Sequence, residues 1–494
     1  MEDKKIDETK EEFIRLEHLK KIEEAGINPF PAKSNRINGL SEALEMNEEE
    51  KVQTTGRLMS KREMGRICFC HLKDGSDTMQ LVFSEKELGK EKFKFFIKNF
   101  DIADFIEVEG VIFTTHKGEL SILIKEYRIL TKALLPLPDK YHGLQDEEMK
   151  LRKRYLDILV NEDVKEMFIR RSKFWKATRD FLAEKGFMEV ETPVLEASAG
   201  GADAAPFVTH HNALDMDVYL RISMGELWQK RLMVAGFEKT FEIGRQFRNE
   251  GMDKEHLQDY SQMEFYWSYA DYEMGMELVE EMYKYIAEET FGTLKFDIGE
   301  FKDIDLDEKW ERIDYVSVIK EKLGINVLKS TDEELSAKLK ELGVKYDKAE
   351  TTGRLIDTLW KQCRKSIKGP AFLINIPVCV SPLAKRMESN SDLTERFQPI
   401  IAGSELGNGY SELNDPLDQE KRFEEQSKMR EAGDNEAQMH DHDFVEALKH
   451  GMPPTCGFGF SERLFSFLEN KSIRTCQIFP LMKPEKLEDD KDKK

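Results

Sequence analysis

The sequence has few cysteines, and their spacing does not suggest a metal site or a disulfide framework. Among 494 residues there are six cysteines and no CxxC pair, which gives no sign of a zinc site. We therefore expect reduced thiols, as in a cytoplasmic protein. The positions are Cys68, Cys70, Cys363, Cys379, Cys456 and Cys476.

Long apolar runs are also absent. No stretch approaches the roughly 20 apolar residues that a membrane helix needs, so we expect no membrane partner. The opening residues MEDKKIDETKEEF are charged throughout, so we expect no secretory signal in them. The chain lacks both the GxGxxG fingerprint and the GxxxxGKS/T loop, so a nucleotide enzyme of this sequence would bind phosphates by other means.

Positive charge is in deficit, since the formal net charge is −21. Taken alone, this balance argues against a nucleic-acid partner, because phosphate binding needs local lysine and arginine. Basic side chains nevertheless gather at three places, so a basic patch on an acidic protein stays open. The clusters are Lys61, Arg62 and Arg66, then Lys150, Arg152, Lys153 and Arg154, and then Arg170, Arg171 and Lys173.

The pattern of apolar residues divides the chain into several parts. Residues 1–50 read as a helical extension, with a helix over 7–25 that Gly26 ends. Residues 51–136 contain five short alternating strands, separated by turn signals at Asp74-Gly75 and Lys117-Gly118. This pattern predicts a small all-β barrel of the oligonucleotide-binding (OB) kind, although a generic β-domain would show the same pattern.

The remaining sequence mixes helices and strands. Residues 137–160 read as a linker with a basic helix, and 161–486 as an α+β domain whose first long helix is capped by Asn161. Lysine- and glutamate-rich helices over about 305–370 resemble an insertion. We expect the charged tail, 487–494, to be disordered.

A predicted hairpin over 240–267 carries the first group of candidate site residues. Residues two apart share a face of a strand, so Arg248 lies with Glu250, and Glu264 lies with Tyr266. An arginine there could grip a phosphate or carboxylate with two hydrogen bonds. Cross-strand ion pairs on a solvated face are the alternative interpretation.

The segment GSELGNGYSELND, residues 403–415, is acidic and rich in glycine. Period-two counting places Asn408, Tyr410 and Glu412 on one face, which is typical of a pocket wall. A buried carboxylate needs a cation, so we expect a ligand to supply the positive charge for Glu412. Glu405 falls on the other face and needs another role. An acidic edge strand in water is the alternative.

A third segment, PPTCGFGFSERLFSFLEN, leads from glycines 457 and 459 into an apolar helix. Arg463 falls in the first turn of that helix, a position that suits a triphosphate.

Together these segments resemble the three signature motifs of class II aminoacyl-tRNA synthetases. FMEVETPVL, with Pro193, is similar to motif 1, FRNE with HLQDYSQME to motif 2, and GFGFSERLF to motif 3. Further segments resemble the lysyl-tRNA synthetases of the bacterial class II type over nearly the whole chain. They are GINPFPA, LLPLPDKYHGLQD, GGADAAPFVTHHNALDMDVYLRI, SPLAKR and ELGNGYSELNDPLDQEKRFEEQ.

The resemblance implies an α+β fold, with an antiparallel sheet of six to seven strands flanked by helices and preceded by an OB-fold barrel. It implies a homodimer formed through motif 1, and tRNA(Lys), L-lysine, ATP and Mg²⁺ as partners. Lysine would attack the α-phosphate of ATP to give lysyl-adenylate and pyrophosphate, and the tRNA 3′ end would then accept the lysyl group.

The resemblance also implies roles for individual residues, with Arg248 and Arg463 as catalytic groups. The implied ATP site consists of Arg248, Glu250, His256, Tyr260, Glu405 and Arg463. The implied lysine site consists of Gly201, Glu226, Arg248, Glu264, Tyr266, Asn408, Tyr410 and Glu412. The implied metal ligand is Glu405, and the implied anticodon contacts are Lys61, Arg62, Phe69, Gln80 and Glu119.

Three departures from the family pattern bear on these roles. Gln398 stands where the family usually has a second magnesium carboxylate, Glu255 replaces a basic residue of the motif 2 loop, and motif 3 is one residue shorter. Two alternatives therefore stay open beside lysine activation. One is an aspartyl- or asparaginyl-type enzyme, and the other is a non-catalytic tRNA-binding paralogue.

Overall fold

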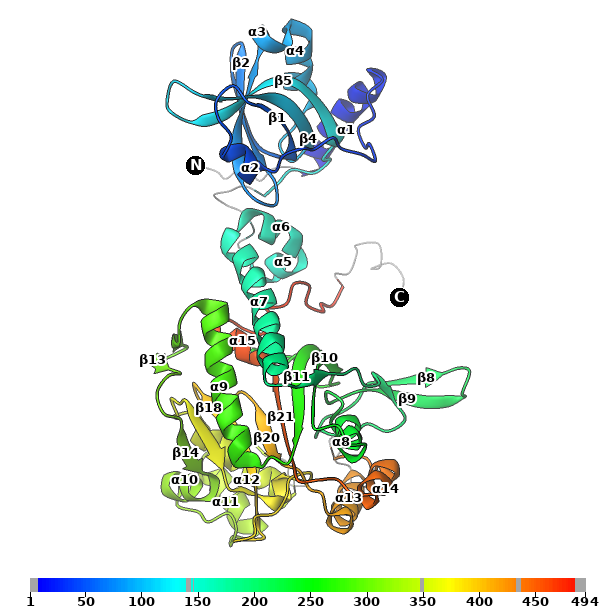
Figure 1. Cartoon of the computed structure of the whole chain (residues 1–494), viewed down its shortest axis with the longest axis vertical. Coiled ribbons are helices and arrows are strands. Elements are labelled where there is room, and N and C mark those ends of the chain that lie inside the picture. The colour runs from blue at the N-terminus through cyan, green and yellow to red at the C-terminus, as the bar shows by residue number, and fades with distance from the viewer. Residues whose placement is uncertain (1–7, 139–143, 145, 347–350, 432–436, 485–494) are drawn as a thin grey trace. The chain divides into compact units, whose positions relative to one another are not determined.

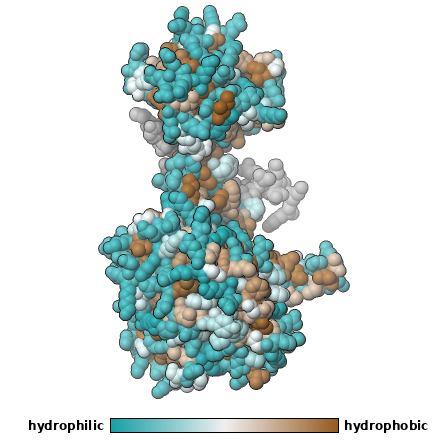
Figure 2. All heavy atoms as spheres, viewed as in Figure 1, coloured by the Kyte–Doolittle hydropathy of each residue, from teal (hydrophilic) through white to brown (hydrophobic). Residues whose placement is uncertain are grey.

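The computed structural model describes residues 8–138, 144, 146–346, 351–431 and 437–484. The chain forms two compact units, Met1–Lys150 and Leu151–Lys494 (Figure 1). Hydrophilic residues cover most of the visible surface of each unit (Figure 2). Among the described residues we find no helix with the length and apolarity that a membrane crossing requires. The tail expected at 487–494 lies outside the described residues.

The first unit is a closed five-stranded barrel with the strand order β1-β2-β3-β5-β4, as the sequence predicts. Side chains at even positions of the second strand, such as Cys68 and Leu72, are buried inside the barrel, while Phe69 and His71 lie on its outer side. The strands are β1 (Lys51–Met64), β2 (Ile67–Lys73), β3 (Thr78–Ser84), β4 (Phe105–Thr114) and β5 (Leu120–Thr131). The helices are α1 (Glu8–Glu24), α2 (Leu40–Leu44), α3 (Glu85–Leu88) and α4 (Lys90–Asn99).

The core of the second unit is built on a nine-stranded sheet, with the order β14-β15-β18-β20-β21-β11-β10-β6 and β19 paired to β18. Only β14–β15 and β10–β6 pair in parallel. The sheet has more strands than the six to seven expected, because short strands extend it. The strands are β6 (Met188–Glu189), β10 (Lys239–Phe247), β11 (Asp259–Ser268), β14 (Glu311–Asp314), β15 (Ala371–Ile374), β18 (Arg396–Ile401), β19 (Ser404–Glu405), β20 (Asn408–Ser411) and β21 (Thr455–Ser461).

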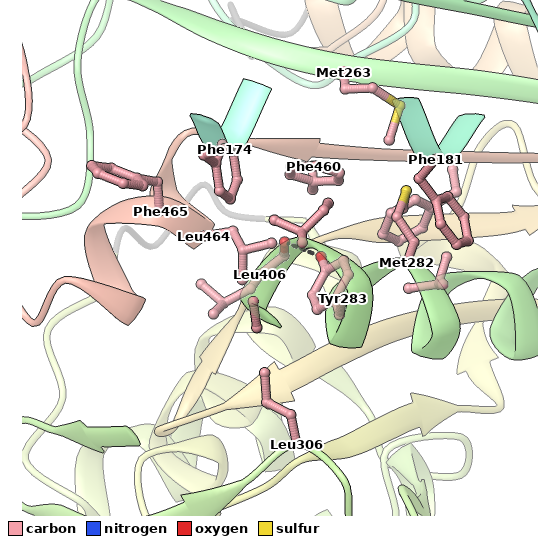
Figure 3. Close-up of a cluster of buried hydrophobic side chains, with 14 of the residues drawn as sticks. Phe174, Phe181, Met263, Met282, Tyr283, Leu306, Leu406, Phe460, Leu464 and Phe465 are labelled. Atoms are coloured by element: carbon pink, nitrogen blue, oxygen red, sulfur yellow. Dashed lines mark hydrogen bonds between the residues drawn. The ribbon is translucent and has the colours of Figure 1, made fainter. Parts of the chain in front are cut away.

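Helices cover one face of this sheet, and α7 (Glu162–Glu184), α9 (Tyr272–Phe291) and α15 (Arg463–Leu468) contribute to the apolar core there. Phe174 and Phe181 from α7 meet Met282 and Tyr283 from α9, beside Phe460 of the sheet (Figure 3). The Tyr283 hydroxyl donates a hydrogen bond of 2.8 Å to the carbonyl of Leu406 (Figure 3). The apolar residues of the central strands therefore point to this face, which leaves their polar residues for the other face.

The insertion expected over 305–370 is helical only in part. Its helices α10 (Tyr315–Leu323), α11 (Asp332–Glu341) and α12 (Thr352–Arg364) share a separate core that includes Trp360. The segment before them corrects the expected boundary, because β14 belongs to the main sheet beside β15.

The remaining elements border this framework. The short helices α5 (Glu147–Arg152) and α6 (Arg154–Val160) occupy the segment read as a basic linker. Further helices are α8 (Glu226–Val234), α13 (Pro416–Glu431), α14 (His442–Lys449) and the 3₁₀ turn Val378–Val380. Smaller sheets contain β7 (Leu195–Glu196), β8 (Val208–His211) and β9 (Met216–Leu220), β12 (Lys295–Ile298) with β13 (Phe301–Asp305), and β16 (Ile376–Pro377) with β17 (Leu393–Thr394).

Candidate active site

The site lies on the sheet face opposite the helical core. Successive side chains of a strand point to opposite faces, so Met263 and Phe265 of β11 pack in the core while Glu264 and Tyr266 face away. The Tyr266 hydroxyl donates 3.0 Å to Glu264 Oε2, as expected for residues two apart on one face. Arg248 and Glu250, in contrast, lie just beyond the end of β10 at Phe247.

Two glycines of the central strand β21 form the floor of a cavity. Gly459 lies between Glu264 and Asn408 in register, and Gly457 lies between Tyr266 and Tyr410. A Cβ at Gly459 would lie 2.7 Å from Glu264 Cγ, and one at Gly457 would lie 2.6 Å from Tyr266 Cε1. Because the glycines carry no side chain, the neighbouring strands enclose a cavity of about 340 Å³.

This cavity brings together nearly all of the expected ligand residues, including those of the predicted hairpin and of residues 403–415. Those that line it are Gly201, Glu226, Arg248, His256, Tyr260, Glu264, Tyr266, Gln398, Glu405, Asn408, Tyr410, Glu412 and Arg463. Glu250 is the exception, since it is exposed, does not line the cavity, and accepts a 3.3 Å hydrogen bond from the backbone of Ala205.

Three carboxylates are buried at one end of the cavity. Glu226 and Glu264 are each 5% exposed, and Glu412 is 1% exposed. Contrary to expectation, the chain itself supplies a cation here. The buried Lys230 ammonium lies 2.6 Å from Glu226 Oε1 and 2.5 Å from Glu412 Oε2. The prediction that Glu412 has no counter-ion within the chain is therefore wrong.

Sequence reasoning missed Lys230 because it lies far from Glu412 along the chain. One signal was available, since Glu226 and Lys230 are four residues apart on a helix and such residues meet on its surface. Glu412 joins this cluster only through the packing of α8 against the sheet. Helical spacing does not reveal that packing.

The carboxylate end remains acidic despite Lys230, because three carboxylates face one ammonium. Oε1 of Glu412 accepts no hydrogen bond from any described residue. Burial raises the pKa of Glu412 well above its ordinary value, and burial together with the charge of Glu226 raises the pKa of Glu264 to about 7. Burial disfavours the Lys230 ammonium, but the charges of Glu226 and Glu412 outweigh it and raise the pKa of Lys230. A ligand cation would relieve this excess of negative charge.

Arginines line the rest of the cavity. Among the described residues, Arg248 has no ion-pair partner, and its buried Nε has no hydrogen-bond acceptor. Arg463 forms an ion pair with Glu255 and donates 3.2 Å hydrogen bonds to Ser404 Oγ and the carbonyl of Glu405. Arg248 is therefore available to an anion, whereas an anion at Arg463 must displace Glu255, a residue we did not predict to line the site.

The expected metal ligand, Glu405, already has partners within the chain. Its Oε1 accepts a 2.5 Å hydrogen bond from Trp360 Nε1, and its Oε2 lies 3.4 Å from Arg364 Nε. Gln398 is neutral, and the described residues contain no cluster of three or more His, Cys, Asp or Glu side chains that could hold a metal. These groups do not form a metal site by themselves. One carboxylate fits only a Mg²⁺ ion that arrives with phosphate ligands.

The barrel carries a separate candidate site on its outer face. Gln80 Nε2 donates 2.7 Å to Glu119 Oε2, its Oε1 accepts 3.0 Å from Ser121, and Phe69 is partly exposed nearby on β2, directly opposite the exposed Arg62. The position of Lys61 differs from the expectation that this residue contacts a phosphate. Its ammonium donates 2.7 and 2.6 Å hydrogen bonds to the carbonyls of Ile97 and Phe100 at the end of α4.

The chemistry open to the larger site follows from this charge separation. One end suits a cation, Arg248 suits an anion, and Arg463 suits a second anion once Glu255 leaves it. No cysteine or serine nucleophile is needed for a ligand that brings both reacting groups, because such a site acts by positioning and by stabilising charge.

Comparison with known proteins agrees with this geometry. A family described as tRNA synthetases class II (D, K and N) matches residues 146–483, and an OB-fold nucleic acid binding domain matches residues 52–130. The chain is 44% identical over 487 residues to a lysine–tRNA ligase of Thermotoga maritima, with 96% of each chain covered. It is 43% identical over 478 residues to a lysine–tRNA ligase of Carboxydothermus hydrogenoformans, covering 95% of this chain and 97% of the relative. The chain therefore belongs to the class II tRNA synthetases of the D, K and N group.

Proposed function

We propose that this chain is a lysine–tRNA ligase, which activates lysine with ATP and transfers the lysyl group to the 3′ end of tRNA(Lys). The relatives named above are lysine–tRNA ligases and match it over almost its whole length. The observation that carries the proposal is the acid-lined end of the cavity, where three carboxylates are buried and one ammonium, that of Lys230, pairs with two of them. Lysine brings two ammonium groups, which match this excess of negative charge.

In the proposed pose, the α-ammonium of lysine lies at Gly201 and Glu226. The ε-ammonium lies among Glu264, Tyr266 and Glu412, where Oε1 of Glu412 is free to accept a hydrogen bond. Asn408 and Tyr410 complete the wall between the two ends. The lysine carboxylate then faces Arg248, the cavity-lining arginine that has no ion pair among the described residues.

The first reaction joins the lysine carboxylate to the α-phosphorus of ATP. A carboxylate oxygen forms the new bond as the bond from the α-phosphorus to the bridging oxygen breaks, and pyrophosphate leaves with the electron pair. Arg248 neutralises charge on the α-phosphate and carboxylate, and Arg463 holds the departing phosphates. In the second step, the terminal hydroxyl of tRNA attacks the lysyl carbonyl and AMP leaves. Positioning and electrostatic stabilisation carry both steps.

The same cavity accommodates ATP in this proposal. The ring of Tyr260 lines it and receives a 2.5 Å hydrogen bond at its hydroxyl from Gln246, so its orientation is fixed for stacking on adenine. His256 lines it close to Glu255 of the same loop. Glu250 would reach adenine only if the loop after β10 moved inward from its exposed position. Mg²⁺ bound to the ATP phosphates would have Glu405 as its protein ligand, with the amide oxygen of Gln398 beside it, and would neutralise phosphate charge.

The barrel would bind the anticodon. Phe69 offers a ring for stacking an unpaired base, and the Gln80–Glu119 pair offers donors and acceptors to a uracil edge. Arg62 is exposed beside Phe69 and suits a backbone phosphate.

The aspartyl- and asparaginyl-type alternatives fit this cavity less well, because a neutral asparagine amide would leave the buried carboxylates without a ligand cation and an aspartate side chain would add a further negative charge. A substrate carboxylate needs a free cation at its side-chain end, but Lys230 is already shared between Glu226 and Glu412. Glu264 would also repel such a substrate. A non-catalytic paralogue is disfavoured because Arg248 and Arg463 both line the cavity.

We also propose a homodimer that forms through the motif 1 region, in a cytoplasmic enzyme. Apolar side chains there are exposed in the single chain, including Met188, Val194 and Leu195, and Leu214 in the β8–β9 hairpin is 64% exposed. Apolar residues are visible on that projecting hairpin (Figure 2). Sedimentation of the intact protein tests this part, since a monomer at micromolar concentration would refute it.

The activation step is tested by amino-acid-dependent exchange of pyrophosphate into ATP. We expect exchange with lysine and not with aspartate or asparagine. Exchange with another amino acid and none with lysine would refute the assignment. Single-turnover transfer of lysine to tRNA then separates a complete ligase from a paralogue that no longer charges tRNA.

A further inference from the structure

Lys230 occupies a position that the proposed reaction does not by itself explain. It lies on α8, is 1% exposed, and joins two carboxylates from separate parts of the chain: Glu226 of its own helix and Glu412, which directly follows β20. Its ammonium also lies over the Tyr410 ring, 5.4 Å from the centroid. Burying a charged lysine is costly, so this side chain needs its carboxylate partners.

We propose that Lys230 is a specificity-determining positioning residue. It fixes the spacing of Glu226 and Glu412, the two carboxylates that receive the α- and ε-ammonium groups of the amino acid. This inference rests on the proposed function, because it assumes that lysine occupies the cavity. The site then selects an amino acid by the distance between its two ammonium groups as well as by charge.

The geometry favours this role over simple charge balance. Each carboxylate gives one oxygen to Lys230, Oε1 of Glu226 and Oε2 of Glu412. Neither oxygen of Glu412 accepts a hydrogen bond from any described residue, and Oε1, which does not pair with Lys230, lies beside Gly457 at the cavity floor. The Tyr410 hydroxyl also donates to Glu226 Oε1. Lys230 thus orients the carboxylate of Glu412 so that its second oxygen is free for a ligand.

The positive charge of Lys230 also opposes protonation of Glu412, because it lowers the pKa of that carboxyl group. The titratable groups facing the cluster are Glu226 on α8, Glu264 and Tyr266 on β11, Tyr410 beside Glu412, and Cys456 on β21. None of them carries positive charge. Without Lys230, burial and the neighbouring carboxylates would raise the pKa of Glu412 further, and its carboxylate would be lost at higher pH than in the native protein.

The test measures lysine-dependent pyrophosphate exchange in the full-length protein carrying Lys230→Met, Glu412→Gln or both. For Lys230→Met we expect the lysine KM at neutral pH to rise by about 100-fold, because one partner of a buried ion pair is lost. The ATP KM should change little. The pH below which kcat/KM for lysine declines should be higher in the variant. The preference for lysine over ornithine should fall by about tenfold or more. A purely structural defect would not move this pH or the preference.

The double variant keeps the proposal testable if Lys230→Met alone does not fold. If Lys230 acts through Glu412, adding Lys230→Met to Glu412→Gln should change the lysine KM by less than about threefold, because coupled residues are non-additive. Independent, additive losses would overturn the proposal, as would a Lys230→Met variant with the native lysine KM and pH profile. Lys284→Met is the matched control, since Lys284 forms the same i,i+4 pair with Glu280 on α9, away from the cavity. Failure of the unaltered protein to exchange with lysine would instead refute the proposed function.

Discussion

Single residues decide how much space and charge the site offers. Gly457 and Gly459 were recognised in the sequence as glycines before an apolar helix, but their place between two polar strands appears only in the sheet register. A period of two predicts that Glu264 shares a face with Tyr266, and Asn408 with Tyr410, whereas only the family resemblance implied that the two pairs share one cavity. Lys230 could not be predicted, because its partner Glu412 is reached only through tertiary packing.

Gly459→Ala tests the role of the glycine floor. The added Cβ would lie 2.7 Å from Glu264 Cγ and 3.2 Å from the carbonyl of Met263, so Glu264 would have to move. Overpacking of this kind costs about 1–3 kcal/mol, and we expect the lysine KM to rise roughly tenfold or more. The measurement is pyrophosphate exchange at varied lysine. Gly75→Ala is the control, because a Cβ at Gly75 meets nothing within 4 Å. An unchanged lysine KM in Gly459→Ala would show that the floor does not limit the site.

Glu196 provides a pH-dependent test outside the cavity. Burial raises its pKa to about 7, although Trp228 Nε1 donates 2.9 Å to its Oε1. The folded state therefore holds the proton more tightly than the unfolded state, where the carboxyl pKa is about 4.3. This contribution to stability is complete below about pH 4 and is lost as pH rises through about 7.

Glu196→Gln should remove that pH dependence. The free energy of unfolding of the variant minus that of the native protein should be about 2–3 kcal/mol larger at pH 8 than at pH 5. Denaturant unfolding at both pH values measures the difference. A constant difference between the two proteins would mean that Glu196 titrates normally.

At the scale of elements, sequence patterns predict strands and their faces better than they predict contacts of loops. The loop between β10 and β11 could be recognised as polar from the sequence. The ion pair between its Glu255 and Arg463 could not be predicted. Helix α1 shows the same limit. The predicted helix over 7–25 is confirmed as Glu8–Glu24, yet Phe13 and Leu16 are exposed while Ile22 is buried, although all three are apolar.

Glu255→Gln tests whether the loop competes with ATP for Arg463. The carboxylate occupies the guanidinium that would hold phosphates, so binding of ATP must break this partly exposed pair. Removing the charge should lower the KM for ATP several-fold, in keeping with roughly 1 kcal/mol for such a pair. Pyrophosphate exchange at varied ATP provides the measurement. Asp259→Asn makes the same charge change at a residue that pairs with Arg245, and should leave the ATP KM unchanged. A higher KM in Glu255→Gln would contradict competition.

Lys61 and Arg62 are adjacent on β1 but should behave differently. Lys61 donates to two carbonyls at the end of α4, whereas Arg62 is exposed. We expect Lys61→Met to destabilise the barrel by about 2–3 kcal/mol, because hydrogen bonds from a charged donor are lost. Arg62→Met should leave stability unchanged and weaken binding of an anticodon stem-loop with a smaller salt dependence. Unfolding and RNA titrations distinguish the two, and the reverse pattern would restore Lys61 as a phosphate contact.

At the scale of the whole molecule, the arrangement in two units could be predicted because the hydrophobic period changes along the chain. A period of two with turn signals predicted the barrel, which closes as β1-β2-β3-β5-β4. The main sheet was harder to predict, since its nine strands include the two-residue strands β6 and β19. Such short pieces form only because neighbouring strands hold them, so local sequence carries little signal for them.

The two sites should therefore be separable by mutation. All residues assigned to lysine and ATP belong to Leu151–Lys494, and the anticodon residues belong to Met1–Lys150. Phe69→Ala should weaken binding of an anticodon stem-loop by roughly 5- to 150-fold, because stacking of one base contributes about 1–3 kcal/mol. Lysine-dependent pyrophosphate exchange without tRNA should stay at the native rate, since it needs only the second unit. Loss of exchange in Phe69→Ala would show that the barrel takes part in amino-acid activation, and unchanged RNA binding would remove Phe69 from the anticodon site.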